Sequence, residues 1–434
     1  MTYYDEQTSL NASFSLSEDN EQFKTLFIAV VIASIASVCV GFSIGYTSPF
    51  NTEYTKLRKD LSFASLLEIG AVIGLILGGF FLEYFGRKKG IMLSAFFYTP
   101  GWILIGYFPK GTILYTGRML TGVATGLCSL TVPIYIAEVS SCQYCGRWLL
   151  AKKKRNEASK TLKWLRGSAY NVEDECNEIE QNLEQQPVAA LNDFRTPGLY
   201  RNLLYGSFLM IFQQMCGKNA MMFFGQEIFY NTGVSKMPLA VYLTQVLITT
   251  TAYFMVDKYG RRKLLMLGAF GMFICNILLG VYFQTLIMYA NNKTLESHFH
   301  NTETNMKEIS NVMLHDSYSW LAITCFVLFL ISYSIGWGAL PFLLMSEIFP
   351  PRLRCFSCVF VLSVNWCLAF FVTYSFISLV CLFQIQRALW LFSTFCFISI
   401  FFVYYFVPET KHKTLEEIEH YYQTFYGFRN YLTN

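Results

Sequence analysis

The chain has 434 residues, of which 54% are hydrophobic and only 14% are charged, with a formal net charge of +4. A soluble protein carries roughly a quarter charged residues, and here long stretches carry almost none. The basic residues cluster in short loops, which is the pattern of membrane topology and not of a nucleic-acid surface. Apolar runs of about 18 or more residues predict transmembrane helices, and their continuous hydrophobicity excludes a barrel. The composition therefore predicts an all-α polytopic membrane protein.

Ten spans are predicted, near 24–47, 62–85, 90–108, 112–138, 200–230, 237–256, 264–289, 319–348, 356–381 and 386–407. They divide the chain into an N-terminal tail (1–23), a four-span half (24–141), a linker with short amphipathic helices (142–198), a six-span half (199–407) and a C-terminal tail (408–434). The long loop 290–318 interrupts the second half.

Basic residues follow every even-numbered span, for example Arg87 after the second and Arg261 after the sixth. Because cytoplasmic loops carry an excess of Lys and Arg, these loops, the linker and both termini are predicted to be cytoplasmic. The loop 290–318 is then extracellular, and its sequon makes Asn292 a candidate glycosylation site of a plasma-membrane protein.

The chain repeats itself, since Glu83–Phe96 matches Asp257–Phe270, each in a tight loop after an apolar span. A second match pairs Ala137–Ser140 with Ser346–Phe349. Two such matches in register indicate a duplicated membrane unit, which is the ground plan of many carriers. Cations and carboxylates at these helix ends can form a cytoplasmic latch, although they can also serve only as topology anchors. The predicted latch and gating residues are Glu83, Gly86, Arg87, Arg118, Glu138, Asp257, Gly260, Arg261, Arg262, Glu347 and Arg354.

Glycines recur every fourth residue in the second and fourth spans, at Gly70, Gly74 and Gly78 and at Gly122 and Gly126. This spacing predicts close helix packing in lipid. In the eighth span, the segment from Gly336 to Pro341 carries two glycines and a proline, which predicts a broken or kinked helix.

Amide side chains lie inside the predicted spans, where they are costly unless they face a partner or a wet cavity. Their donors and acceptors suit hydroxyl-rich ligands, and aromatic faces at Trp337 and Phe342 can support a sugar ring. The alternative, hydrogen bonding between helices, has equal weight from the residues alone. The predicted ligand residues are Gln213, Gln214, Asn219, Gln245, Phe342 and Asn365.

No nucleotide-binding loop, HExxH motif or nucleophile elbow is present, so an enzyme is not expected and no cofactor is predicted. The 13 cysteines lie mostly inside apolar runs and are interpreted as small hydrophobes. The pair Cys142 and Cys145 has no second pair nearby, so no metal site is predicted.

Motifs in a fixed order then resemble the sugar porter family of the major facilitator superfamily. They are Gly117-Arg118, Pro133–Ser140, Arg147–Leu150, Gln213–Ala220, Glu347–Arg354 and Val407–Glu417. The resemblance implies two pseudo-repeated halves, alternating access, and a small-molecule sugar bound mainly by the second half. Within the family, Gly45–Pro49 resembles the facilitated trehalose transporters of insects. The resemblance thus implies transport of trehalose or a hexose.

Several departures from the family pattern bear on function. Phe342 stands where the family usually has Trp, and Lys218 lies beside the binding amides. After Gly146 the chain passes directly to Arg147, a motif that normally follows the sixth helix of the family, so the fifth and sixth helices are predicted to be missing. Such a chain is expected to carry sugar poorly by itself. It can also be a transport-deficient sensor or interaction partner, or an incomplete isoform or gene model of a carrier.

The residues of the first span indicate whether sugar transport is coupled to protons. Proton-driven relatives place an acid there, whereas this span offers only Ser43 and Thr47 at the corresponding positions. The sequence therefore predicts uniport down a gradient. The oligomeric state is not predicted.

Overall fold

The computed structural model describes residues 27–46, 61–108, 111–140, 149–150, 153–166, 172–184, 197–222, 237–297, 319–349 and 353–411. Every regular element in these residues is helical, which confirms the all-α part of the predicted fold class. Eight helices among them are long and apolar enough to cross a membrane. They coincide with eight of the predicted spans.

Helices α9 (Pro197–Met215) and α11 (Met237–Tyr259) occupy the two remaining predicted spans. The predicted fifth span is interrupted, because the helix breaks at Cys216 and Gly217 before continuing to Met222. Gly217 has a φ of +84°, a conformation that glycine adopts without strain. The count of ten membrane crossings therefore stays a prediction.

The first half contains the helix Phe27–Gly45 and three longer helices, α3 (Leu61–Phe85), α4 (Arg87–Tyr107) and α5 (Gly111–Ser140). Helices α3 and α5 pack most closely, as the glycine spacing predicts. A Cβ atom on Gly74 would lie 2.1 Å from the Val123 carbonyl oxygen, and one on Gly126 would lie 2.0 Å from that of Ala71. Any larger residue there would separate the two helices.

The two duplicated loops are tighter than predicted, because a single glycine forms each. Gly86 joins α3 to α4 with φ +85°, and Gly260 joins α11 to α12 (Arg261–Ser297) with φ +86°. The basic residues that follow therefore lie in the first turn of a helix and not in a loop. The matching backbone conformation extends the sequence repeat to the structure.

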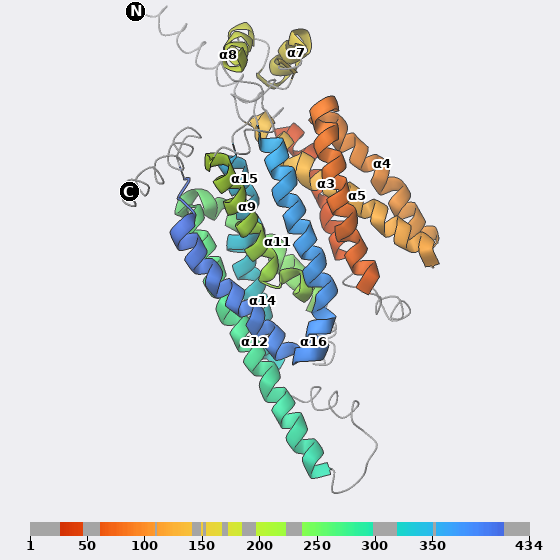
Figure 1. The fold of residues 1–434 in the computed structure, drawn as a ribbon, viewed down its shortest axis with the longest axis vertical. Coiled ribbons are helices and arrows are strands. Elements are labelled where there is room, and N and C mark those ends of the chain that lie inside the picture. Colours follow the sequence, from red (N-terminus) through yellow and green to blue (C-terminus); the bar gives the residue numbers. More distant parts are fainter. Residues whose placement is uncertain are drawn as a thin grey trace, which may run out of the picture.

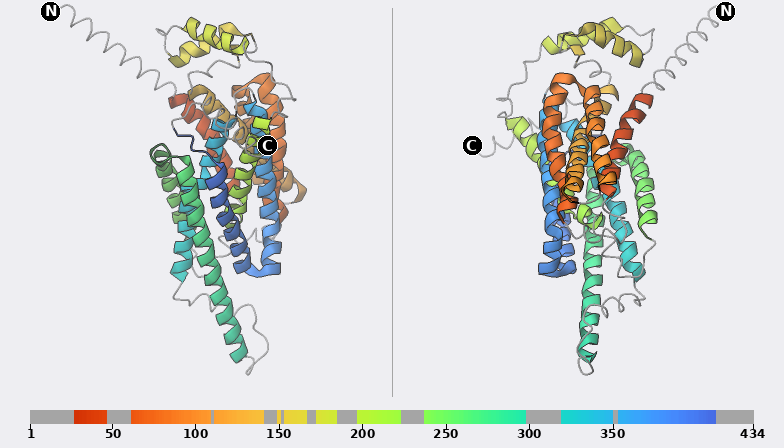
Figure 2. Two further views of the ribbon diagram at one scale, coloured as in Figure 1. Left: turned by 60° about the vertical axis from the view of Figure 1, so that its left-hand side comes forward. Right: turned by 90° about the vertical axis from the view of Figure 1, so that its right-hand side faces the viewer.

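The linker contains two amphipathic helices, as predicted, α7 (Arg155–Arg166) and α8 (Val172–Glu184). They bury Leu162 and Cys176 against each other, and Arg155 on α7 donates hydrogen bonds to Glu173 and Glu180 on α8. This helix pair lies beyond one end of the membrane bundle (Figure 2).

The second half continues with α12, α14 (Ser319–Ser332), the π-helix η2 (Tyr333–Gly338), α15 (Leu340–Ile348) and α16 (Arg354–Phe406). Helix α16 holds two predicted spans, which meet at Gln384, where the backbone leaves the helical conformation with φ 66°. Helix α12 extends to Ser297, so the predicted loop 290–318 begins as helix and Asn292 lies on the extension seen in Figure 1.

The halves meet mainly through α16, which packs against α3 of the first half and against α9 and α12 of the second. Large apolar side chains remain exposed around the bundle, among them Phe80, Phe96, Val246 and Leu247. An apolar outer surface of this extent suits lipid and not water. The membrane assignment therefore agrees with the exposed surface as well as with helix length.

Candidate functional site

Four of the predicted ligand residues form one connected hydrogen-bond network. Asn219 Nδ2 donates to Gln214 Oε1 (2.7 Å), and Gln214 Nε2 donates to Asn365 Oδ1 (3.0 Å). Asn365 Nδ2 donates in turn to Gln213 Oε1 (2.8 Å). We call these four side chains the amide network. It joins α9 and the short helical turn after it to α16, and three of its members, Gln213, Gln214 and Asn365, are buried.

The amide network ends on the broken eighth span. Gln213 Nε2 donates to the carbonyl oxygens of Trp337 (2.7 Å) and Gly338 (3.2 Å) in η2. A π-helix leaves backbone carbonyls free of regular α-helical partners, so it can receive such a donor. The predicted break is therefore confirmed, and it contacts the amides directly.

The two aromatic candidates differ in their surroundings. Trp337 is fully buried and donates its Nε1 hydrogen to the Leu265 carbonyl oxygen (3.0 Å), so it packs in the core and offers no open face. Phe342 is half-buried on α15 beside the cluster of Met345 and Trp366. Its place next to the amide network remains a prediction.

Two further polar residues flank this region. Lys218 lies between Gly217 and Asn219 and holds its ammonium group 5.5 Å from the centre of the Tyr333 ring. This cation–π contact provides the partner that a cation in such a segment requires. Gln245 is half-buried on α11, and the described hydrogen bonds do not connect its side chain to the amide network.

Two residues of the predicted second-half latch meet at the turn between α11 and α12, and their role as a latch stays a prediction. Arg261 forms an ion pair with Glu347 on α15, with 3.2 Å between the Nη2 and Oε1 atoms. Burial raises the pKa of the Glu347 carboxyl. The Thr410 hydroxyl and Arg261 oppose this rise, because both favour the ionised form of the carboxyl. Arg262 contacts the end of α16, where it donates to the Tyr404 carbonyl oxygen.

Two latch residues were not predicted as such, Glu409 and Thr410, which follow α16 in the chain. The Glu409 carboxylate accepts hydrogen bonds from the backbone N–H groups of Arg261 (2.9 Å) and Arg262 (3.2 Å), at the N-terminus of α12. An acidic group is stabilised there by the helix dipole. Thr410 Oγ1 donates to Glu347 Oε2 (2.6 Å), which closes the group. The signal was available in the motif Val407–Glu417, to which no role had been assigned.

The first-half counterparts are described in part. Gly86 forms the expected turn, with Glu83 and Arg87 on either side of it. The side chains of Glu138 and Asp257 lie outside the described residues. Arg354 is buried in the first turn of α16, six residues beyond the end of α15 in sequence. The pairing of these residues across the repeat remains a prediction.

Arg118 lies apart from the other predicted latch residues, and its gating role stays a prediction. Arg118 lies near the start of α5, about 30 Å along the helix from Glu138 at 1.5 Å per residue. Its Nη1 atom donates to the Ser43 carbonyl oxygen (2.8 Å), and its guanidinium lies over the Phe63 ring at 5.2 Å. Arg118 is therefore a buried cation at the opposite end of the bundle.

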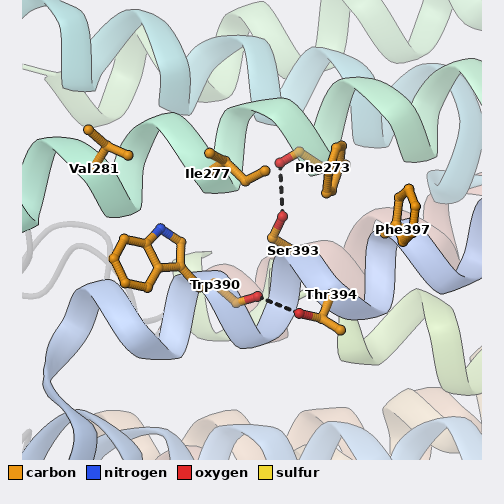
Figure 3. A pocket seen from close by; sticks show the side chains of 7 residues that line it. All are labelled: Phe273, Ile277, Val281, Trp390, Ser393, Thr394 and Phe397. Carbon is orange, nitrogen blue, oxygen red and sulfur yellow. Dashed lines mark hydrogen bonds between the residues drawn. The ribbon is translucent and has the colours of Figure 1, made fainter.

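A groove of about 430 Å³ runs between α12 and the last part of α16 (Figure 3). Its lining is almost wholly apolar, since Ser393 and Thr394 bond to the carbonyl oxygens of Phe273 and Trp390. None of the predicted ligand residues lines it. Val281, Trp390 and Phe397 of its lining are exposed, so the groove opens on the surface of the bundle, and its apolar lining does not suit a polar ligand.

Comparisons with known proteins agree with this architecture. The chain is 29% identical to the facilitated trehalose transporter Tret1 of Bombyx mori, over 91% of this chain and 86% of that one. It is 30% identical to the facilitated glucose transporter member 8 of solute carrier family 2 from Bos taurus, over 91% and 94%.

Solved structures share the fold. A xylose transporter XylE from E. coli, in a partially occluded inward-open conformation, superimposes with a TM-score of 0.66 at 19% identity, covering 90% of this chain and 100% of that one. The proton:xylose symporter XylE bound to 6-bromo-6-deoxy-D-glucose gives 0.69 at 20%, covering 92% and 100%. A family profile described as "Sugar (and other) transporter" matches residues 29–147 and 146–422. The chain therefore belongs to this family of membrane sugar transporters and is not an enzyme.

Proposed function

We propose that the chain is a facilitative carrier that moves trehalose or a hexose down its gradient by alternating access. The proposal is supported most directly by the amide network, which collects uncharged donors and acceptors where two broken helices meet α16. Carboxamides match sugar hydroxyls, which both donate and accept, without attracting ions. The similarity to trehalose and glucose transporters supports the same substrate class.

The network suggests how a sugar binds. Within the amide network each carboxamide bonds to another, so its buried amide groups are satisfied. A sugar that inserts its hydroxyls between Gln214, Asn219 and Asn365 exchanges amide–amide bonds for amide–hydroxyl bonds. Such an exchange is close to neutral per bond, about 0.5–1.5 kcal/mol each, so affinity comes from several bonds formed together.

We attribute the conformational change of alternating access to the two interrupted helices. The break at Gly217 lies between Gln214 and Asn219 in the sequence. The carbonyl oxygens of η2 accept the hydrogen bonds of Gln213. Discontinuous helices beside a binding site allow one end to swivel as the halves rock. The second-half latch holds α12, α15 and the segment after α16 together at one end, as one rigid part of that movement.

A second candidate is a transport-deficient relative or an incomplete form of a carrier. The specific observation is that the family match divides at residues 146–147, where two helices are predicted to be missing. An intact family member would close its pathway with those helices, whereas this chain would expose polar groups to lipid. Transcript sequencing across the codons for Tyr144 to Trp148 distinguishes an incomplete gene model from a true short form.

The proposal is tested by sugar binding and uptake with the purified protein. Saturable binding of trehalose or glucose, lost when Gln214 is changed, supports the carrier. Binding without uptake in liposomes supports the transport-deficient relative. Absence of binding from the folded protein contradicts the carrier, because the amide network would then be purely structural, and it leaves only the interaction partner or the incomplete form.

A further inference from the structure

One carboxylate inside the bundle has no part in the proposed sugar site or latch. Glu68 on α3 is 1% exposed and is the only acidic residue among the buried side chains of the described part of the chain. It lies within the candidate span Ser65–Phe85. A carboxylate inside a membrane span is costly and marks a functional position by default.

The surroundings of Glu68 come from both halves. Thr373 Oγ1 on α16, in the second half, donates to Glu68 Oε1 at 3.5 Å. Arg118 on α5 acts on Glu68 through space, and its own Nη1 atom is bound to the Ser43 carbonyl oxygen. Glu68 Oε2 is buried and has no hydrogen-bond partner among the described residues. The carboxyl therefore faces one cation and one hydroxyl, with one oxygen unsatisfied.

Within the described residues, the other elements packed against α3 bring no further charge to this point. The charged residues of α4 are Arg87, Lys88 and Lys89, at the first turn of that helix. Glu68 lies about 22 Å along α3 from Glu83, which adjoins that turn, at 1.5 Å per residue. The helix Phe27–Gly45 contains no charged residue. Arg118 and Thr373 are thus the charged and polar groups that face Glu68 from α5 and α16.

We propose that Glu68 is a proton-binding site that links the separation of the two halves, at the end of the bundle opposite the Gly86 turn, to pH. The proposal rests on alternating access as proposed above. The proposed proton site requires no acidic residue in the first span. The second span supplies the carboxyl of Glu68, on which Arg118 acts through space.

The physical basis is a change in the surroundings of one carboxyl. With α3 and α16 in contact, Glu68 is sealed from water beside Thr373. When the halves part at this end, water reaches the carboxyl and the Thr373 contact is lost. The proton affinity of a carboxyl differs between two such surroundings, so pH shifts the balance between the two conformations.

The experiment measures conformation directly, so that it does not depend on transport. Hydrogen–deuterium exchange of the purified full chain in lipid nanodiscs is followed in peptides of α3 and α16 between about pH 5 and about pH 8, corrected for intrinsic exchange. Linkage of one proton changes an equilibrium by up to about tenfold per pH unit, so we expect protection in the wild type to change by about threefold or more.

Three variants separate the causes. Glu68→Gln should make protection independent of pH, Glu68→Asp should retain a pH dependence because it keeps a carboxyl, and Thr373→Val should shift its midpoint. The control Glu157→Gln, the same change on exposed α7, should behave as the wild type does. Protection that is independent of pH in the wild type, or equally dependent on pH in Glu68→Gln, would overturn the proposal.

Transport by the same variants distinguishes this proposal from the proposed function. A protein that moves no sugar but shows pH-dependent protection, lost in Glu68→Gln, refutes the carrier and supports the proton site. Sugar accumulation that a protonophore abolishes, and that Glu68→Gln lacks, supports the proton site and refutes uniport.

Discussion

Replacing Gln214 by alanine is the sharpest test of whether the amide network binds sugar. Gln214 is the central member, since it accepts from Asn219 at 2.7 Å and donates to Asn365 at 3.0 Å. Removal of the Gln214 amide deletes both bonds. The Asn365 Oδ1 acceptor and the Asn219 Nδ2 donor each lose their Gln214 partner. Each deleted bond contributes about 0.5–1.5 kcal/mol, and a stranded buried group costs about 1–3 kcal/mol.

These magnitudes predict two separate effects. The fold should lose about 1–3 kcal/mol, which lowers the melting temperature without preventing folding. Sugar binding should weaken by several-fold to about tenfold, because about 1.4 kcal/mol corresponds to a factor of ten in affinity. The assays are thermal unfolding of the purified protein and a binding titration with trehalose and glucose.

A matched control separates binding from stability. Asn202→Ala removes another buried amide from α9, whose Nδ2 donates to the Ile348 carbonyl oxygen at 3.2 Å. It should lower the melting temperature comparably and leave the dissociation constant unchanged. If Gln214→Ala behaves like Asn202→Ala, with unchanged affinity, the amide network serves only to join helices and the proposed sugar site is wrong.

Three further outcomes are expected. Glu409→Gln keeps the shape of the side chain but removes the charge that caps α12, so it should lower the melting temperature by an amount equivalent to about 1–2 kcal/mol; a change no larger than in Glu157→Gln would count against the latch. Asn292 should carry a glycan when the chain is made in a cell that glycosylates, and its absence at the cell surface would place this helix end in the cytoplasm. A chain with two family helices inserted after Gly146 should take up sugar faster than the 434-residue chain, and equal rates would show that those helices are dispensable.

Much of the fold follows from patterns that depend only on neighbours in the chain. Apolar run length placed eight of the spans where the structure has membrane-length helices. The glycine spacing in α3 and α5 predicted their close approach, since small residues at every fourth position line one helix face. The segment from Gly336 to Pro341 was predicted to break a helix, and its first three residues lie in the π-helix η2.

The position of Arg118 shows where a motif by itself is a weak guide. The motif groups this cation with the latch, but its position near the start of α5 puts it at the far end of the bundle. The Arg261–Glu347 ion pair, by contrast, joins two residues that the sequence places at span ends on the same side.

Contacts between segments that are distant in the chain could not be predicted from the sequence. The bonds that join Gln213 to Trp337 and to Asn365 depend on how α9, η2 and α16 meet, which no local pattern specifies. The role of Glu409 depends likewise on its return to the start of α12. Glu68, however, was detectable as a lone acid within an apolar span, which is a strong signal that had been overlooked.

The central claim, that this chain carries sugar down its gradient through the amide network, is tested most directly by uptake into liposomes. The purified protein is reconstituted, and entry of labelled trehalose and glucose is followed to its plateau. We predict saturable uptake, slowed by Gln214→Ala, that stops when the concentrations inside and outside are equal. Absence of saturable uptake of either sugar by this chain would contradict the claim, whether or not the version with two inserted helices takes sugar up.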